Sequence, residues 1–271
     1  MPKRIPNTQT GSLTDNQHGT NDMLIGGDIA ANVLYGDAFS MFDNARGGND
    51  TLIGGANTSN ELFGDAFAMY DEAYGGNDTL IGGANAINDL FGDAFDMRDD
   101  ARGGNDTLIG GALAFINNFF GDALTMYDKA HGGNDTLIGG EGSVNWLRGD
   151  AQDMRDDAHG GNDTLIGVDD SLNNLFGDAI DMRDNARGGN DTLISGNGTD
   201  VMWGDAQIIN GVPASPTAAT GTVETGADTY VFAPGNGSDY IYDFRQSDHD
   251  KIDLSARVGK GSQTQIKIVL I

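Results

Sequence analysis

Gly-Gly-Asn-Asp-Thr-Leu-Ile, at residues 103–109, decides the fold, because the same seven residues return along the chain at a spacing of 28, once 29. A frayed first copy lies at residues 19–25. The complete copies are Gly47–Ile53, Gly75–Ile81, Gly103–Ile109, Gly132–Ile138, Gly160–Ile166 and Gly188–Ile194. A fixed period that carries glycines, a carboxylate and an aliphatic pair predicts a solenoid in which each repeat forms one coil.

A second motif, Asn-x-Leu-x-Gly-Asp-Ala, interleaves with this tract. Its copies are Asn32–Ala38, Asn60–Ala66, Asn88–Ala94, Asn145–Ala151 and Asn173–Ala179, with a phenylalanine variant at Asn117–Ala123 and a looser copy at Asp200–Ala206. Within one coil, Leu80 and Leu90 point inward from two short strands, since strands follow a period of two. We therefore predict an all-β fold, a right-handed parallel β-roll or wider β-solenoid of about seven 28-residue coils with a C-terminal β cap.

The rest of each coil is an excursion, represented by residues 92–102. Ala94, Met97 and Ala101 lie at positions i, i+3 and i+7, a spacing that suits one face of a helix, with a third short strand as the alternative. The methionine repeats in every coil, and we expect it to fill the core because methionine packs well into irregular apolar space.

The composition predicts a chain that needs a counter-ion. Glycine supplies 42 residues, hydrophobic residues reach only 38%, and the formal net charge is −26. Such values are typical of disorder, whereas the repeated Leu-Ile pair argues against permanent disorder. Equivalent aspartates on stacked coils would lie about 5 Å apart, and each such contact would cost roughly 3 kcal/mol at an effective dielectric near 20. We expect an open chain without a cation and a folded chain with one. Nucleic acid is excluded as a partner, because its phosphates would be repelled.

Four segments divide the chain. Residues 1–18 form a polar leader, 19–209 the calcium-binding repeat array, 210–225 a linker, and 226–271 a C-terminal cap with a possible secretion signal. The leader lacks the apolar core of a cleavable signal peptide, and no apolar run approaches the length of a membrane span. Cysteine is absent, which excludes disulfides and thiolate metal sites.

The repeats offer the ligands that calcium prefers, which are about 6–8 oxygens from carboxylates and main-chain carbonyls. Glycine permits positive φ and close backbone approach, so carbonyls can converge on an ion. We predict that several Ca²⁺ ions are held between adjacent coils, which makes binding and folding one event. The predicted ligands are the tract aspartates Asp22, Asp50, Asp78, Asp106, Asp135, Asp163 and Asp191, the second-motif aspartates Asp37, Asp65, Asp93, Asp122, Asp150, Asp178 and Asp205, and the glycines Gly48, Gly76, Gly104, Gly133, Gly161 and Gly189.

Two further polar columns have open interpretations. The asparagine of the second motif either binds calcium through its amide oxygen, for which Asn60 and Asn88 are the candidates, or forms a structural ladder of stacked amides. The aspartates of the excursion either bind an ion or cap a local turn. They are Asp43, Asp71, Asp99, Asp128, Asp156 and Asp184.

These motifs resemble the repeats-in-toxin family, also called hemolysin-type calcium-binding repeats, whose nonapeptide is Gly-Gly-x-Gly-x-Asp-x-hydrophobic-x. Residues 104–108 match its second part, and Gly110 and Gly111 open the next unit. In the tail, residues 235–241 fit the nonapeptide, with Asp239 as a candidate ligand, and Asp250–Ser255 resembles the ending that follows such arrays in secreted proteases. The resemblance implies calcium-driven folding and type I secretion from a Gram-negative bacterium, guided by an uncleaved C-terminal signal. The coils here are longer than is usual in the family.

The resulting expectation is a secreted, calcium-dependent structural or interaction protein with a possible cell-surface or matrix partner, and no enzyme. The four histidines vary along the surface and no nucleophile context accompanies them. Two alternatives stay open, an ice-binding protein with an outward Thr/Ile ladder and a passive calcium buffer. An outward aromatic column is expected to be covered by the excursion and its methionines; if it is exposed, it predicts self-association. The column is Tyr35, Phe63, Phe91, Phe120, Phe176 and Trp203.

Overall fold

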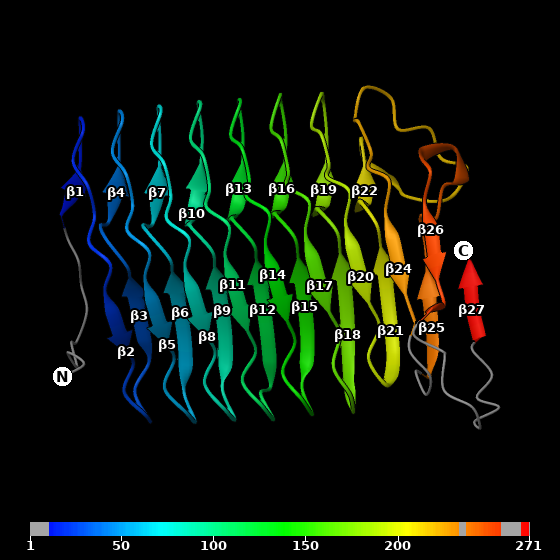
Figure 1. The fold of residues 1–271 in the computed structure, drawn as a ribbon, viewed down its shortest axis with the longest axis horizontal. Helices are drawn as coiled ribbons and strands as arrows, with labels where there is room; N and C mark the ends of the chain where they lie inside the picture. The colour runs from blue at the N-terminus through cyan, green and yellow to red at the C-terminus, as the bar shows by residue number, and fades with distance from the viewer. Residues whose placement is uncertain (1–10, 233–236, 256–266, 271) are drawn as a thin grey trace.

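A computed structural model describes residues 11–232, 237–255 and 267–270, the last segment as backbone alone. The chain winds into coils that stack in sequence order from the N-terminal to the C-terminal end (Figure 1). Each full coil adds one strand to each of three nine-stranded sheets. The prediction of an all-β solenoid of parallel stacked coils is confirmed, in the wider form, because a third strand separates the two that the repeats predict.

The first sheet contains the Thr-Leu-Ile strands, whose central leucine is buried between two half-buried residues. Identical residues pair across neighbouring coils, as Leu108 does with Leu80 and Leu137. All its strands are parallel neighbours. They are β2 (Met23–Ile25), β5 (Thr51–Ile53), β8 (Thr79–Ile81), β11 (Thr107–Ile109), β14 (Thr136–Ile138), β17 (Thr164–Ile166), β20 (Thr192–Ile194), β24 (Thr229–Val231) and β26 (Lys251–Asp253).

The second sheet contains the Asn-x-Leu strands, in which the asparagine and the leucine both point inward. It faces the first sheet across a core of stacked leucines that includes Leu80, Leu90 and Phe119. Its strands are β3 (Asn32–Tyr35), β6 (Ser59–Phe63), β9 (Ile87–Phe91), β12 (Ile116–Phe120), β15 (Val144–Arg148), β18 (Ser171–Phe176), β21 (Gly198–Trp203), β25 (Ser238–Ile241) and β27 (Lys267–Leu270).

The third sheet is the excursion, which is therefore a strand and not a helix. Ala94 lies at the corner where the chain enters the strand, Met97 points inward, and Ala101 lies in the turn that follows, so a spacing of three and four arises without a helix. The methionines are fully buried with these alanines, as predicted. The strands are β1 (Ser12–Leu13), β4 (Ser40–Met41), β7 (Ala68–Met69), β10 (Ala94–Met97), β13 (Ala123–Met126), β16 (Ala151–Met154), β19 (Ala179–Met182), β22 (Ala206–Ile209) and the antiparallel β23 (Val212–Pro213).

The aromatic column is covered on the outside of the corner between the second and third sheets. Phe91 stacks on Phe120 with ring centroids 4.8 Å apart and meets Phe95 from the excursion at 5.8 Å. Phe91 and Phe120 are at most 5% exposed. Outward side chains such as Phe95 cover Phe91 and Phe120, whereas Phe176 and Trp203 belong to the same buried cluster as the methionines.

Both ends of the described chain continue the stack. Strand β1 lies within the predicted leader and pairs with β4, while β24, β25 and β26 extend the first and second sheets beyond the predicted linker. A 3₁₀ turn (Gln246–Asp248) joins β25 to β26. Parts of the predictions lie outside the described residues, namely 1–10 of the leader and 233–236, 256–266 and 271 of the predicted cap with its possible secretion signal. No helix among the described residues is long and apolar enough to span a membrane.

Candidate metal centre: two buried columns of aspartate

The tract aspartates form one column, which we call the tract column, at the entrance to the first sheet. Each backbone N–H donates to the Oδ1 of the next aspartate along the stack, as Asp78 does to Asp106 at 2.7 Å. The column continues beyond the predicted ligands because Asp228 and Asp250 follow the same pattern. Its buried members are Asp50, Asp78, Asp106, Asp135, Asp163, Asp191, Asp228 and Asp250, each at most 8% exposed; Asp22 is only half-buried at the N-terminal end.

The second-motif aspartates form the corner column, where the chain leaves the second sheet. Each accepts a hydrogen bond from the N–H of a glycine in the following tract, 11 residues later except for Asp205, whose partner Gly226 lies 21 residues later. Gly104 donates to Asp93 at 3.0 Å and Gly133 to Asp122 at 2.7 Å. The predicted tract glycines therefore hold the carboxylates through N–H groups. The corner column is Asp37, Asp65, Asp93, Asp122, Asp150, Asp178 and Asp205, each at most 9% exposed.

Both columns leave carboxylate oxygens buried without a hydrogen-bond partner. A buried, unsatisfied polar atom costs about 1–3 kcal/mol, and more when it carries charge, so a repeated set of them requires a physical reason. The orphaned atoms are the Oδ2 oxygens of Asp50, Asp78, Asp106, Asp135, Asp163, Asp191 and Asp228 in the tract column and of Asp122, Asp150 and Asp178 in the corner column.

Glycines lie directly against these oxygens, where a Cβ would collide with neighbouring atoms. A Cβ on Gly92 would lie 1.6 Å from the carbonyl oxygen of Gly121 and 2.3 Å from Oδ2 of Asp106. A Cβ on Gly103 would lie 2.1 Å from Oδ1 of Asp122. Main-chain carbonyls and carboxylates from successive coils thus converge beside these glycines, where a side chain would have no room.

The conformational reason predicted for the glycines is wrong in part. Among the described residues, the glycines with positive φ are Gly142, Gly211 and Gly221, none of which belongs to a tract. The close approach of stacked backbones is what requires glycine, since a Cβ on Gly104 would lie 1.3 Å from the carbonyl oxygen of Gly76.

The electrostatics of the columns are unfavourable for bare carboxylates. Burial raises the pKa of Asp93 well above its usual range, and the charges of Asp106 and Asp65 raise it further. Burial likewise raises the pKa of Asp78 to about 8 and that of Asp122 to about 6. The carboxylates of the two columns therefore need either protons or a counter-charge.

One position already has its counter-charge. At the C-terminal end Nη1 of Arg245 donates to Oδ2 of Asp205 at 3.1 Å, and the two side chains are 4% and 3% exposed. Among the ion pairs of the described residues, this is the one that involves either column. The fold thus supplies a cation to Asp205 near the C-terminal end of the stack, while Oδ2 of the neighbouring Asp228 stays without a partner.

The donor set fits a hard divalent cation on condition that the backbone contributes. Within residues 11–232 and 237–255, no three acidic or histidine side chains converge on one point. A site would therefore combine one or two carboxylates with carbonyl oxygens, as calcium sites in proteins commonly do. Oδ2 of Asp106 and the carbonyl oxygen of Gly121, which both lie against Gly92, illustrate part of such a set.

The asparagines form a hydrogen-bonded ladder. Oδ1 of Asn88 accepts from Gly83 N–H at 2.8 Å and from Nδ2 of Asn60 at 2.8 Å, while its own Nδ2 donates to Asn117 and to the Gly83 carbonyl. Asn60 has the same partners one coil earlier. These bonds occupy both lone pairs of each amide oxygen, so we do not retain Asn60 and Asn88 as ligands. Asp239 stands at the end of this ladder, accepting from Asp200 N–H at 3.2 Å, and belongs to neither aspartate column.

The excursion aspartates serve the turn after the third sheet. They are exposed and adopt φ between 57° and 61°, a left-handed conformation that aspartate tolerates better than most residues. In five of them, Asp43 to Asp156, Oδ2 accepts from a backbone N–H of the preceding coil at 3.3–3.5 Å, as Asp99 does from Asp71. The geometry favours the turn-capping interpretation.

The sequence analysis missed the C-terminal members of the columns. Gly226-Ala227-Asp228-Thr229-Tyr230-Val231 is a degenerate copy of the tract, and its offset of 37 residues from Asp191 hid it from a search at 28. Arg245 carries no repeat signal. Comparison with protein-family models, curated proteins and solved structures finds no match.

Proposed function

We propose that this chain binds several Ca²⁺ ions between the tract and corner columns, and that it folds when it binds them. The observation that carries the proposal is the file of buried, partnerless Oδ2 oxygens, at nearly the same place in successive coils. Calcium would be coordinated by these oxygens together with the carbonyls of the glycines that precede the corner aspartates, such as Gly92 and Gly121. Because Gly92 faces the carbonyl of Gly121 in the next coil, an ion there would tie adjacent coils together.

The strength of the requirement follows from repetition. The cost of one unsatisfied carboxylate would be tolerable. The summed cost of ten orphaned oxygens would exceed a typical total folding stability of about 5–15 kcal/mol. Protons are the competing solution, since the raised pKa values allow neutral carboxyls. At pH 8 or above, protons become scarce and calcium is the remaining counter-charge.

The test is far-UV circular dichroism of the full chain at pH 8 during calcium titration over roughly 10⁻⁶ to 10⁻² M, which covers sensor and extracellular affinities. We expect a transition from an open chain to β structure, accompanied by protease resistance. Magnesium, which demands compact octahedral geometry and keeps its waters, and sodium chloride at matched ionic strength are the controls. A chelated chain as compact and resistant as the loaded one would overturn the proposal.

A passive calcium buffer differs from this proposal in one measurable respect. A buffer would take up calcium, measured by isothermal titration calorimetry, without any change in circular dichroism. Coupled folding instead links the two signals at the same calcium concentration.

We extend the proposal to a setting outside the cell, with type I secretion from a Gram-negative bacterium and a cell-surface or matrix partner. The support is the repeats-in-toxin resemblance together with the calcium dependence proposed above. A chain that stays open at low calcium suits passage through an export channel. Detection of the intact protein in culture medium, lost with the partner export genes deleted, tests this part.

Ice binding is a second candidate, favoured by the outer face of the first sheet. Thr107 and Ile109 pair in register with their counterparts in the coils on either side, and both are half-buried. This gives two regular outward rows. A thermal hysteresis assay of the folded chain tests the idea, with Thr136→Lys in the middle of the face as the disabling variant and Lys129→Ala, on the third-sheet turn, as control. Absence of hysteresis removes this candidate.

A further inference from the structure

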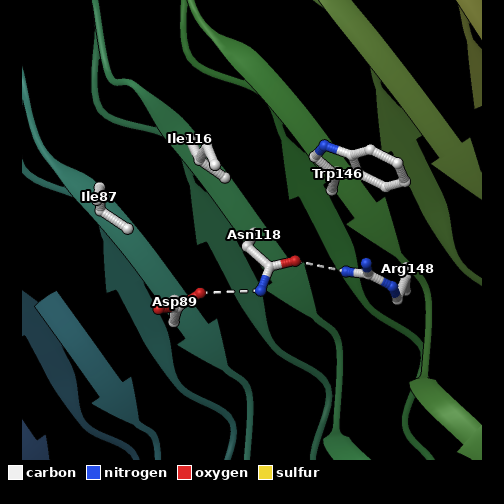
Figure 2. Close-up of a pocket in the computed structure, with 6 residues that line it drawn as sticks. All are labelled: Ile87, Asp89, Ile116, Asn118, Trp146 and Arg148. Carbon is white, nitrogen blue, oxygen red and sulfur yellow. Dashed lines mark hydrogen bonds between the residues drawn. The ribbon is translucent and has the colours of Figure 1, made fainter. Parts of the chain in front are cut away.

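The outer face of the second sheet carries a pocket beside Arg148, a residue that departs from the repeat (Figure 2). Its volume is about 320 Å³, at the lower end of the 300–1,000 Å³ that small-molecule sites occupy. Three neighbouring strands, β9, β12 and β15, contribute two outward residues each. The lining is Ile87, Asp89, Ile116, Asn118, Trp146 and Arg148.

Arg148 is the residue that the fold does not explain. Its position in the aromatic column belongs to Phe120 in the preceding coil and to Phe176 in the next, so phenylalanine satisfies the packing. The guanidinium lies between these rings, 4.6 Å from one centroid and 5.9 Å from the other. Arg148 is 6% exposed, and its Nε is buried without a hydrogen-bond partner.

The floor of the pocket is a chain of polar groups. Nη1 of Arg148 donates to Oδ1 of Asn118 at 2.7 Å, and Nδ2 of Asn118 donates to Oδ1 of Asp89 at 2.8 Å (Figure 2). Donor, amide and acceptor thus follow one another across three strands. The walls are apolar, since Ile87 and Ile116 are 42% and 39% exposed and Trp146 is half-buried beside them.

We propose that this pocket binds one neutral hexopyranose residue of a glycan. A pyranose has an apolar C–H face and a rim of hydroxyls, each of them both donor and acceptor. The half-exposed Trp146 ring offers a flat apolar surface for the first. The guanidinium, amide and carboxylate of the floor offer donors and acceptors for the second.

The surrounding charge selects a neutral sugar over an acidic one. Asp89 lines the pocket, and Glu61 is its partner on the adjoining strand in the same outward row. A uronate or sulfated sugar would meet these carboxylates and a chain of net charge −26. Arg148 already stacks on aromatic rings and bonds to Asn118, so it is not free to pair with an anion in the open.

The test uses the full chain with calcium present and tryptophan fluorescence as the readout. The chain has two tryptophans, of which Trp203 is 7% exposed. Trp203→Phe, the residue found one coil earlier, leaves Trp146 as the single reporter. Methyl glucoside, galactoside and mannoside, with glucuronic acid as the acidic probe, would be titrated first, then the matching trisaccharides. We expect saturable change with at least one neutral sugar and no response to glucuronic acid.

Two variants restore residues that neighbouring coils already use, so neither should harm the fold. Arg148→Phe copies Phe120, and Trp146→Asn copies Asn118 at the equivalent outward position. Each should weaken binding at least tenfold, with calorimetry replacing fluorescence for Trp146→Asn. Lys129→Ala, which removes one positive charge from an exposed turn as Arg148→Phe does from the pocket, should bind normally. Failure of every neutral sugar to bind, preference for the acidic probe, or unchanged binding by both variants would overturn the proposal.

Discussion

The asparagine ladder and the two aspartate columns run through the same coils with the same period, yet they differ in whether their buried polar atoms have hydrogen-bond partners. Asn88 has both oxygen lone pairs and both amide hydrogens engaged, with partners at 2.8–3.0 Å. Asp106 accepts one backbone hydrogen bond at Oδ1 and leaves Oδ2 buried and unsatisfied. The two side chains have the same shape and differ by one atom.

The difference follows from donor chemistry. An amide carries both a donor and an acceptor, so identical amides stacked in register satisfy one another. An ionised carboxylate only accepts, and a stack of carboxylates adds like-charge repulsion to the missing donors. The ladder is therefore a finished structural device, whereas the columns are complete only with protons or cations. The following predictions separate these two kinds of column.

The largest expected effect is a reversal of pH dependence on calcium removal. Burial raises the pKa of Asp50 to about 7 and that of Asp78 to about 8. The calcium-free folded state therefore binds more protons than the unfolded state, and its stability falls as pH rises from about 4 through 8. We expect the chelated chain to be folded near pH 5 and open at pH 8, as measured by circular dichroism and thermal unfolding.

The calcium-loaded chain should show the opposite slope, because protons compete with calcium for the same oxygens. The amide ladder does not titrate and so contributes nothing to either slope. A chelated protein whose stability is flat or rises between pH 5 and 8 would contradict the assignment of the columns as the source of the calcium dependence.

Next in size is the conversion of one ladder amide into a carboxylate. Asn117→Asp removes the Nδ2 donations to the Gly111 carbonyl at 3.2 Å and to Asn145 at 2.9 Å, and places a charge beside those two oxygens. An uncompensated buried charge costs about 3–5 kcal/mol. Urea unfolding at pH 8 with saturating calcium should show this loss.

Asn105→Asp is the matched control, since that side chain is exposed and surface substitutions usually change stability by less than about 0.5 kcal/mol. Equal losses of stability for the two variants would show that burial of Asn117 in the ladder adds nothing to the cost of the substitution.

The sequence predicts the ladder and the columns to different depths, and these residues show why. Repetition places Leu80, Asn88 and Asp106 at fixed points of a coil, so a parallel solenoid with stacked identical residues follows directly. Whether Asn88 binds an ion or its neighbours depends on hydrogen-bond geometry, which spacing does not contain. The third strand was ambiguous because Ala94 and Ala101 lie at the corners on either side of it, which gives them and Met97 a helix-like spacing. Arg148 and Arg245 break the repeat, and only packing reveals what each one faces.

The third effect has opposite signs in the two calcium states. Asp106→Asn replaces the orphaned Oδ2 by an amide that can donate toward the Gly121 carbonyl. In chelator near pH 6, where the calcium-free chain still folds, we expect a gain of about 1–3 kcal/mol, since the variant no longer buries an unsatisfied oxygen or a carboxyl that must take up a proton on folding. With calcium, the same variant should melt lower than the parent and bind less calcium by calorimetry.

Asp99→Asn controls for the loss of one negative charge, because Asp99 is an exposed turn residue. It should move neither melting temperature by more than a degree or two. If Asp106→Asn moves both melting temperatures in the same direction, the tract column is structural and its carboxylates do not ligate calcium.

The smallest effect lies where the two kinds of column meet, at the last rungs of the ladder. Asn173 donates to Oδ1 of Asp200 at 2.6 Å, but Oδ2 of Asp200 is buried without a partner, and burial raises its pKa to about 7. Asp200→Asn supplies the missing amide donor opposite Asp239. We expect a gain of about 1 kcal/mol, the net value of one hydrogen bond, in urea unfolding at pH 8. At pH 5 the native carboxyl is protonated and can itself donate, so the gain should vanish. A gain of equal size at both pH values would mean that the substitution does not act through the missing donor, and that a stack of amides is no better at this position than a stack that ends in acid.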